Sequence, residues 1–153
     1  MKLTSSAFKE KAIIPSLYTC EGKNINPPLE FQGVPAAAKS LVLIMDDPDV
    51  PCTLRPDGMY DHWVVFNIPP ATKSIPEHAK PPGIQGMNTA GKSQYIGPCP
   101  PDREHRYFFK LYALDTLLQL FATATKKEVE AAMKGHILAH AELMGKYEKG
   151  KGY

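Results

Sequence analysis

Two aspartates and two histidines stand at points of the sequence where predicted strands begin or end. Asp47 and Asp49 follow an apolar run in the turn Asp-Pro-Asp-Val-Pro. His62 opens a second apolar run, and His105 opens a third. Imidazole rings can donate hydrogen bonds and can be charged near neutral pH. If the three runs are neighbouring strands, we expect these side chains to meet at one end of a sheet.

The segment 97–101, Gly-Pro-Cys-Pro-Pro, leads toward His105 and the hydroxyl of Tyr107. Proline has no N–H and a fixed φ, so Gly97 and Cys99 carry the backbone donors of this stretch. Glycine also permits a close approach by a ligand. A stiff loop with a few directed N–H groups, flanked by histidines and a phenol, predicts a site for a small anion.

The elements that must position these residues are short apolar runs bounded by proline and glycine. The runs 41–45, 63–68 and 106–114 are strand-like in length and composition, and 29–31 is a shorter candidate. Fifteen prolines in 153 residues favour a mainly β architecture with rigid connections. We expect a single domain over 1–153.

Only the end of the chain looks helical. Thr125 and Glu128 have the spacing of a capping box. Apolar residues then recur at helical spacing as far as Met144, which predicts one amphipathic helix packed on the sheet. His136 and His140 would lie on its apolar face at a spacing that could hold zinc, but Ile137 replaces the glutamate of the zinc-protease motif. Packed core histidines are the favoured interpretation, so we predict no metal site.

The segment 86–93, Gly-Met-Asn-Thr-Ala-Gly-Lys-Ser, matches the nucleotide-binding P-loop pattern. That motif requires a strand before the loop and a helix after it, whose N-terminus receives the phosphates. Prolines precede the segment at 81–82 and follow it at 98–101. A helix beginning at Lys92 could not continue, so we do not expect a P-loop.

Charge and cysteine usage exclude several classes of protein. A net charge of +2, without a basic cluster on one face, argues against nucleic-acid binding. No apolar run is long enough to span a membrane. The three cysteines, Cys20, Cys52 and Cys99, lack metal-site spacing. With no signal peptide, they predict a cytoplasmic protein with reduced thiols.

The turn at 47–51, the segment 61–67 (Asp-His-Trp-Val-Val-Phe-Asn), the segment 97–101 and His105-Arg-Tyr107 resemble, in order, the signature regions of the phosphatidylethanolamine-binding proteins. The branch resembled is the compact bacterial and archaeal one, described as Raf-kinase-inhibitor-like. The resemblance implies an antiparallel β-fold of two packed sheets with peripheral helices, including one C-terminal helix. It also implies a preformed pocket for phosphate, acetate or a phosphorylated headgroup, and a cis peptide at Val50–Pro51.

By the same resemblance, Asp47 matches the pocket aspartate, His62 and His105 the two pocket histidines, and Tyr107 the tyrosine beside them. The segment 102–104, Asp-Arg-Glu, departs from the small residues of relatives and places three charges at the rim. The whole predicted ligand-binding set is Asp47, Asp49, Pro51, His62, Gly97, Pro98, Cys99, Pro101, His105 and Tyr107.

The favoured function is non-catalytic binding of a small anionic or phosphorylated ligand, with no cofactor. Asp47 would orient a histidine, share a proton with a phosphate monoester, or meet the ammonium of an ethanolamine headgroup. One alternative is an inhibitory or scaffolding role toward a protein partner such as a kinase or protease. Another is a hydrolase with Cys99 as nucleophile, a histidine as base and Asp47 as orienter. The resemblance to small bacterial relatives, which often pair, also suggests a homodimer, although no motif requires one.

Overall fold

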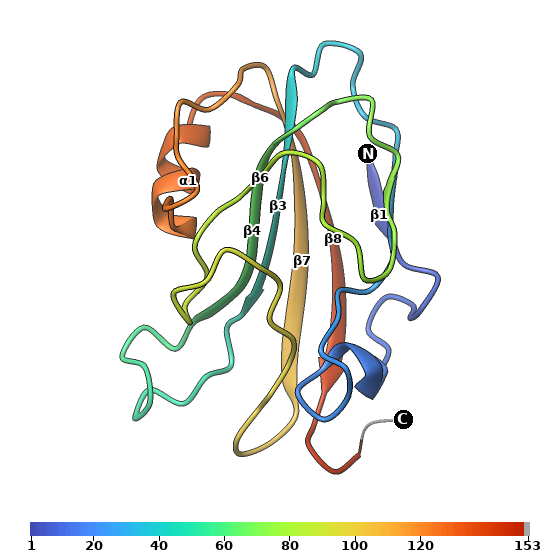
Figure 1. The fold of residues 1–153 in the computed structure, drawn as a ribbon, viewed down its shortest axis with the longest axis vertical. Coiled ribbons are helices and arrows are strands. Elements are labelled where there is room, and N and C mark those ends of the chain that lie inside the picture. Colours follow the sequence, from blue (N-terminus) through green and yellow to red (C-terminus); the bar gives the residue numbers. More distant parts are fainter. Residues whose placement is uncertain (152–153) are drawn as a thin grey trace.

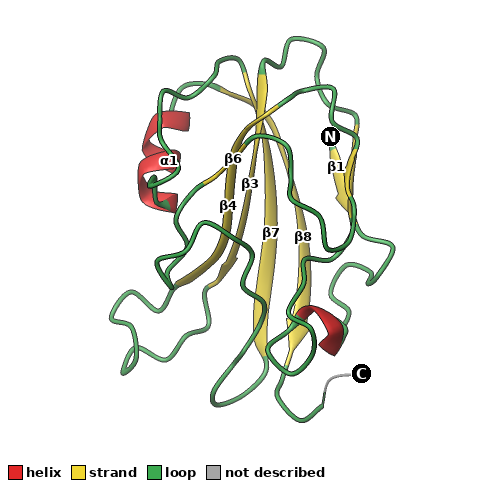
Figure 2. Ribbon diagram, viewed as in Figure 1, coloured by secondary structure: helices red, strands yellow, loops and turns green. Residues whose placement is uncertain are grey.

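The computed structural model describes residues 1–151; residues 152–153, the end of the predicted domain, lie outside the described part. Apart from a 3₁₀ turn at Ser16–Tyr18, the elements are one helix and eight strands (Figure 2). In chain order they are β1 (Lys2–Thr4), β2 (Leu29–Gln32), β3 (Ser40–Asp47), β4 (Tyr60–Ile68), β5 (Ser74–Ile75), β6 (Ile84–Gln85), β7 (His105–Leu114), α1 (Lys126–Met133) and β8 (Ile137–Tyr147).

The larger sheet is antiparallel and has the strand order β6-β4-β3-β7-β8 (Figure 1). The runs predicted as strands from their apolar composition form β3, β4 and β7, and these three are neighbours. Their polar ends therefore lie at one end of the sheet, as the sequence predicts. The predicted class of fold, mainly β with two antiparallel sheets, is confirmed.

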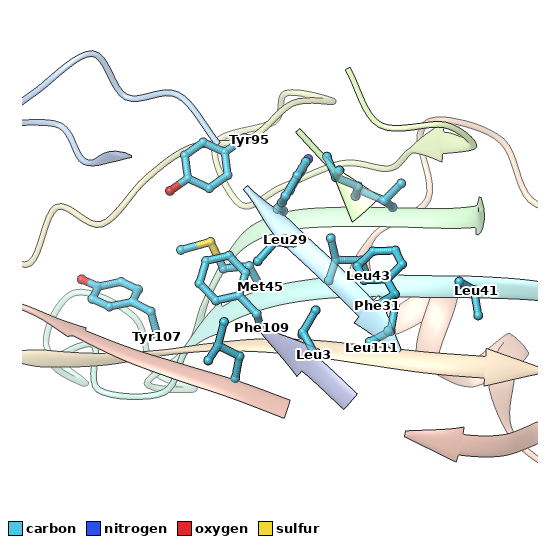
Figure 3. Close-up of a cluster of buried hydrophobic side chains, with 14 of the residues drawn as sticks. Leu3, Leu29, Phe31, Leu41, Leu43, Met45, Tyr95, Tyr107, Phe109 and Leu111 are labelled. Carbon is cyan, nitrogen blue, oxygen red and sulfur yellow. The ribbon is translucent and has the colours of Figure 1, made fainter. Parts of the chain in front are cut away.

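The smaller sheet, β1-β2-β5, covers one face of the larger one. Figure 3 shows the apolar side chains that fill the space between the two layers. They include Leu3, Leu29, Phe31, Leu41, Leu43, Met45, Phe109 and Leu111. Burial of this surface, at about 25 cal/mol per Å², is the main force that holds the layers together.

The helix α1 covers part of the opposite face of the large sheet (Figure 1). Val129 and Met133 of α1 pack with Val42 and Ile44 of β3. Both faces of β3 are thus buried, which explains its unbroken apolar run, since a strand with one solvated face alternates. The predicted capping box is present, because the Thr125 side chain accepts from the Glu128 N–H and the Glu128 side chain accepts in return.

The prediction that this helix continues to Met144 is wrong. The helix ends at Met133, and Gly135 follows with a φ of +81°, a left-handed conformation that favours glycine after a helix. Residues 137–147 form β8, in which Leu143 and Tyr147 are buried at even spacing. His136 precedes the strand and His140 lies within it, so the predicted helical pair of histidines does not form.

No helix among residues 1–151 is long and apolar enough to cross a membrane. The segment 86–93 forms a loop in which the Asn88 side chain accepts from the Lys92 N–H and donates to the Gln94 carbonyl. No helix follows it before β7. The structural context of a P-loop is therefore missing, in agreement with the sequence argument.

Candidate functional site

A pocket of about 410 Å³ lies where β3, β4 and β7 present their polar ends. The loops that surround it, 48–59 and 95–104, lie at the lower end of the sheet in Figure 1, with the segment 16–24 nearby. The lining residues come from all three segments and from the strand ends. They are Cys20, Asn24, Asp47, Val50, Leu54, Arg55, Tyr60, His62, Ile96, Gly97, Cys99, Pro100, Pro101, His105 and Tyr107.

A buried pair of side chains, Asp47 and His105, forms the floor of this site. Asp47 Oδ2 lies 2.6 Å from His105 Nδ1, and the two side chains are 4% and 1% exposed. Asp47 Oδ1 accepts a second hydrogen bond from the Asp49 N–H at 2.7 Å. The carboxylate is thus hydrogen-bonded inside the protein, in a geometry that can orient a histidine.

The other nitrogen of His105 is also engaged. Nε2 lies 2.7 Å from Asp102 Oδ1, and the Asp102 side chain is 39% exposed. Both ring nitrogens of His105 are therefore paired with a carboxylate of the protein. The hydrogen bond from His105 is the main reason that the pKa of Asp102 is lowered.

His62 has no carboxylate partner among residues 1–151 and lies in a more apolar environment. Its Nδ1 donates to the Ile96 carbonyl at 2.7 Å, and the side chain is buried between the rings of Tyr60 and Tyr107, whose centroids lie 4.8 Å and 5.3 Å away. Burial is the largest cause that lowers the pKa of His62 to about 4. At neutral pH the ring is uncharged, and Nε2 keeps its lone pair as an acceptor.

The hydroxyl of Tyr107 is buried and makes no hydrogen bond with any residue from 1 to 151. Asp47 and the backbone amide of Cys99 lie close enough to act on its charge, but neither has hydrogen-bonding geometry. Burial, followed by the charge of Asp47, raises the pKa of Tyr107, so the phenol stays protonated. The pocket therefore contains a buried donor without a partner.

The wall formed by the segment 97–101 is fixed to the segment 16–24. The Gly97 N–H donates to Asn24 Oδ1 at 2.7 Å, and the Cys20 N–H donates to the Pro98 carbonyl at 3.1 Å. A Cβ on Gly97 would collide with the carbonyl oxygen of Tyr18. The glycine is thus needed for a close approach by the protein's own backbone. The sequence predicts that its N–H donates to a ligand, but in the structure this N–H already donates to Asn24.

A disulfide joins Cys20 and Cys99, with Cα atoms 5.5 Å apart, and Cys52 is free and exposed. The prediction of reduced thiols is therefore wrong for Cys20 and Cys99. The predicted cytoplasmic location, which rested partly on it, stays a prediction. The bond also leaves Cys99 without a thiol, so the alternative of a hydrolase with Cys99 as nucleophile loses its nucleophile.

Three residues of the predicted set do not line the pocket. Asp49 turns away and binds the Arg106 guanidinium at 2.9–3.0 Å, which is the main reason that its pKa is lowered. The carbonyl of Pro51 accepts from two N–H groups of the turn that follows it, and Pro98 binds Cys20 as described. No peptide bond among residues 1–151 is cis, so the expectation of a cis Val50–Pro51 bond is wrong.

The structure adds polar residues that sequence reasoning missed, chiefly Asn24, Arg55 and Tyr60. Tyr60 stands two residues before His62, and alternation along a strand could have placed it on the same face. Asn24 has a φ of +58°, and Arg55 donates to the Met59 carbonyl at 2.7 Å. Both lie in loops, where sequence periodicity gives no direction for a side chain.

Alternation also explains which acidic residues are absent from the pocket. Asp46 and Asp61 adjoin Asp47 and His62 in the chain but point to the other face of the sheet. There both contact Lys126, at 3.2 Å and 3.0 Å. This ion cluster fixes the start of α1 to the sheet and leaves the pocket with Asp47 as its buried carboxylate.

The chain thus has the architecture of a small β protein with two packed antiparallel sheets and a pocket at one end of three central strands. The family model described as phosphatidylethanolamine-binding protein matches residues 4–148. The chain belongs to this family.

Close relatives occur in bacteria and archaea. A UPF0098 protein of Chlamydia trachomatis is 52% identical over 149 residues, which cover 97% of this chain and 99% of that protein. A UPF0098 protein of Methanothermobacter thermautotrophicus is 49% identical over 156 residues, which cover 98% and 100%.

Solved structures agree. CT736 of Chlamydia trachomatis, described as a putative phosphatidylethanolamine-binding protein homologue, superimposes with a TM-score of 0.94 at 51% identity over 97% of both chains. E. coli YbcL, described as a member of the mammalian family, gives 0.86 at 30% identity over 96% and 97%.

Loss of the Cys20–Cys99 disulfide is expected to lower the free energy of unfolding. The bond spans 79 residues, and closing a loop of that length removes unfolded-state entropy worth about 4 kcal/mol. Urea denaturation of the Cys52→Ser protein with and without reductant measures the difference. Cys20→Ser should reproduce the reduced value. Equal midpoints in both conditions would contradict the bond.

His62 should make stability depend on pH. Between pH 6.5 and about 4 the unfolded chain binds a proton on His62 that the native protein does not, so the free energy of unfolding falls as the pH is lowered through this window. The expected total loss is about 3 kcal/mol. Denaturation at several pH values, compared with His62→Gln, isolates this contribution. Parallel curves for the two proteins would show that His62 is not buried in its neutral form.

Proposed function

We propose that the pocket binds the anionic group of a small phosphorylated ligand without catalysing a reaction. The observation that carries this proposal is the Tyr107 hydroxyl, a buried donor without a protein partner. A buried polar group of this kind costs about 1–3 kcal/mol unless something satisfies it. A ligand oxygen beside it would remove that cost.

The electrostatics of the pocket support an anion that carries one proton. Asp47 is hydrogen-bonded to His105 and to the Asp49 N–H, so it repels an anion less than an isolated carboxylate would. The neutral His62 offers an acceptor, which suits a protonated oxygen or an ammonium group. A phosphate monoester with one proton supplies acceptors for Tyr107 and a donor for His62.

The dimensions of the pocket favour more than inorganic phosphate. A volume of about 410 Å³ falls in the range of pockets for small organic ligands. Apolar walls from Leu54, Ile96 and Pro100 adjoin the polar floor. The carbon atoms of a headgroup such as phosphoethanolamine fit that division, and Arg55 lines the same pocket with a cation.

Family membership supports ligand binding in general, and the phosphorylated ligand is the finer part of this proposal. The alternative of a regulated protein partner, and the homodimer, stay hypotheses. No contact among the described residues favours either of them over a small ligand.

Tyr107→Phe should weaken binding of inorganic phosphate and of O-phosphoethanolamine roughly tenfold, since a hydrogen bond to a charged group contributes about 1.5–3 kcal/mol. The same change should leave the free energy of unfolding equal or higher, because the hydroxyl has no partner in the free protein. NMR titration of the histidine ring signals at low salt measures affinity, and urea denaturation measures stability.

Tyr95→Phe is the matched control. Its hydroxyl donates to the Tyr18 carbonyl at 2.7 Å and does not line the pocket. We expect this variant to lose about 1 kcal/mol of stability and to keep its affinity. Unchanged phosphate binding by Tyr107→Phe, or the absence of saturable shifts in the wild type, would contradict the proposed function.

A further inference from the structure

Asp102 places a carboxylate on the outer nitrogen of His105, the position where an anion from solution would be expected to bind. Oδ1 lies 2.7 Å from Nε2, the same kind of charge-assisted hydrogen bond that a phosphate oxygen would make. Pro101 and His105 both line the pocket, so Asp102 belongs to the segment that closes it. His105 has no other free donor, because Nδ1 is bound to Asp47.

The Asp102 side chain can leave this position. It is 39% exposed, whereas His105 is 1% exposed, so water surrounds part of the carboxylate and none of the ring. The other oxygen of the carboxylate, Oδ2, already lies 3.7 Å from Arg103 Nε. Arg103 is itself held near the site by a hydrogen bond to the Asp49 carbonyl. A displaced Asp102 would therefore still be paired.

We infer that Asp102 is an internal competitor for the anion-binding position of His105, so that a ligand binds only by displacing it. This inference rests on the proposed function, and it names Asp102 as the residue that lowers the affinity of the pocket for anions. The competing group is covalently attached, and its effective concentration exceeds that of a dilute free carboxylate. The competition raises the apparent dissociation constant of every anion that uses this nitrogen, and further contacts in the pocket are needed to offset it.

The size of the effect follows from the exposure of the pair. The apparent dissociation constant is the intrinsic one divided by the fraction of molecules in which His105 Nε2 is free. For a partly exposed ion pair, we expect this effect to raise the apparent dissociation constant about threefold to fivefold. Because the factor belongs to the protein, it applies equally to every anion that uses this nitrogen.

The test is the affinity of Asp102→Ala for inorganic phosphate and for acetate, measured by NMR titration beside the wild type. We expect both dissociation constants to fall by the same factor, about threefold to fivefold. Asp102→Asn keeps the size and the hydrogen-bond acceptor but not the charge. Its dissociation constants should lie between those of the wild type and those of Asp102→Ala. Without ligand, the ¹⁵N signal of His105 Nε2 should shift in Asp102→Ala while that of His62 stays in place.

Glu104→Ala is the matched control, since it removes the same charge from the same rim without removing the carboxylate that binds His105. Tighter binding by Asp102→Ala alone supports the inference. An equal increase in anion affinity in both variants would contradict the inference, because general charge repulsion would then explain it. An unchanged or lower affinity of Asp102→Ala would also overturn the inference. If the wild type binds phosphate and Tyr107→Phe weakens that binding, the proposed function stands in each of these cases. If no variant binds either anion, both fail together.

Discussion

The buried hydrogen bond between Asp47 and His105 is the constraint on which the pocket depends. Removing one member of such a pair leaves an uncompensated charge in the interior, at a cost of about 3–5 kcal/mol. The pair joins the end of β3 to the start of β7. It therefore fixes the position of both loops that leave these strands, including the turn at 47–51 and the segment 102–104. The shape of the site follows from this one contact and from the disulfide across the pocket wall.

The same strands carry two separate polar systems because neighbouring residues of a strand point to opposite faces. Asp47 and His62 lie on the face of the pocket, whereas Asp46 and Asp61 bind Lys126 beneath α1. A shift of one residue in the register of β3 would exchange Asp46 and Asp47, which would separate Asp47 from His105 and Asp46 from Lys126. The ion cluster under α1 and the pocket thus stabilise the same register from opposite sides.

The sequence predicts the central part of this fold well, since apolar runs bounded by proline and glycine identify β3, β4 and β7. The convergence of Asp47, His62 and His105 follows from the same runs. Residues 137–147 were harder, because Ile137, Ala141 and Met144 fit a helical period while Ala139, Ala141 and Leu143 fit an alternating one. Gly135 was the signal that separates the two. The disulfide could not be predicted, since a spacing of 79 residues carries no information on distance in space. Contacts of Asn24 and Asp102 depend on loop conformation, which local patterns do not determine.

The two histidines of the pocket have different surroundings. His105 has a carboxylate at each ring nitrogen. His62 faces a carbonyl and two aromatic rings, where burial keeps it neutral. The pocket therefore presents a histidine whose two nitrogens are already paired, an uncharged acceptor and a phenol that is free to donate. Because both nitrogens of His105 are held by the protein's own carboxylates, a ligand that uses this ring has to replace one of them, and the outer one, Asp102, is the more exposed.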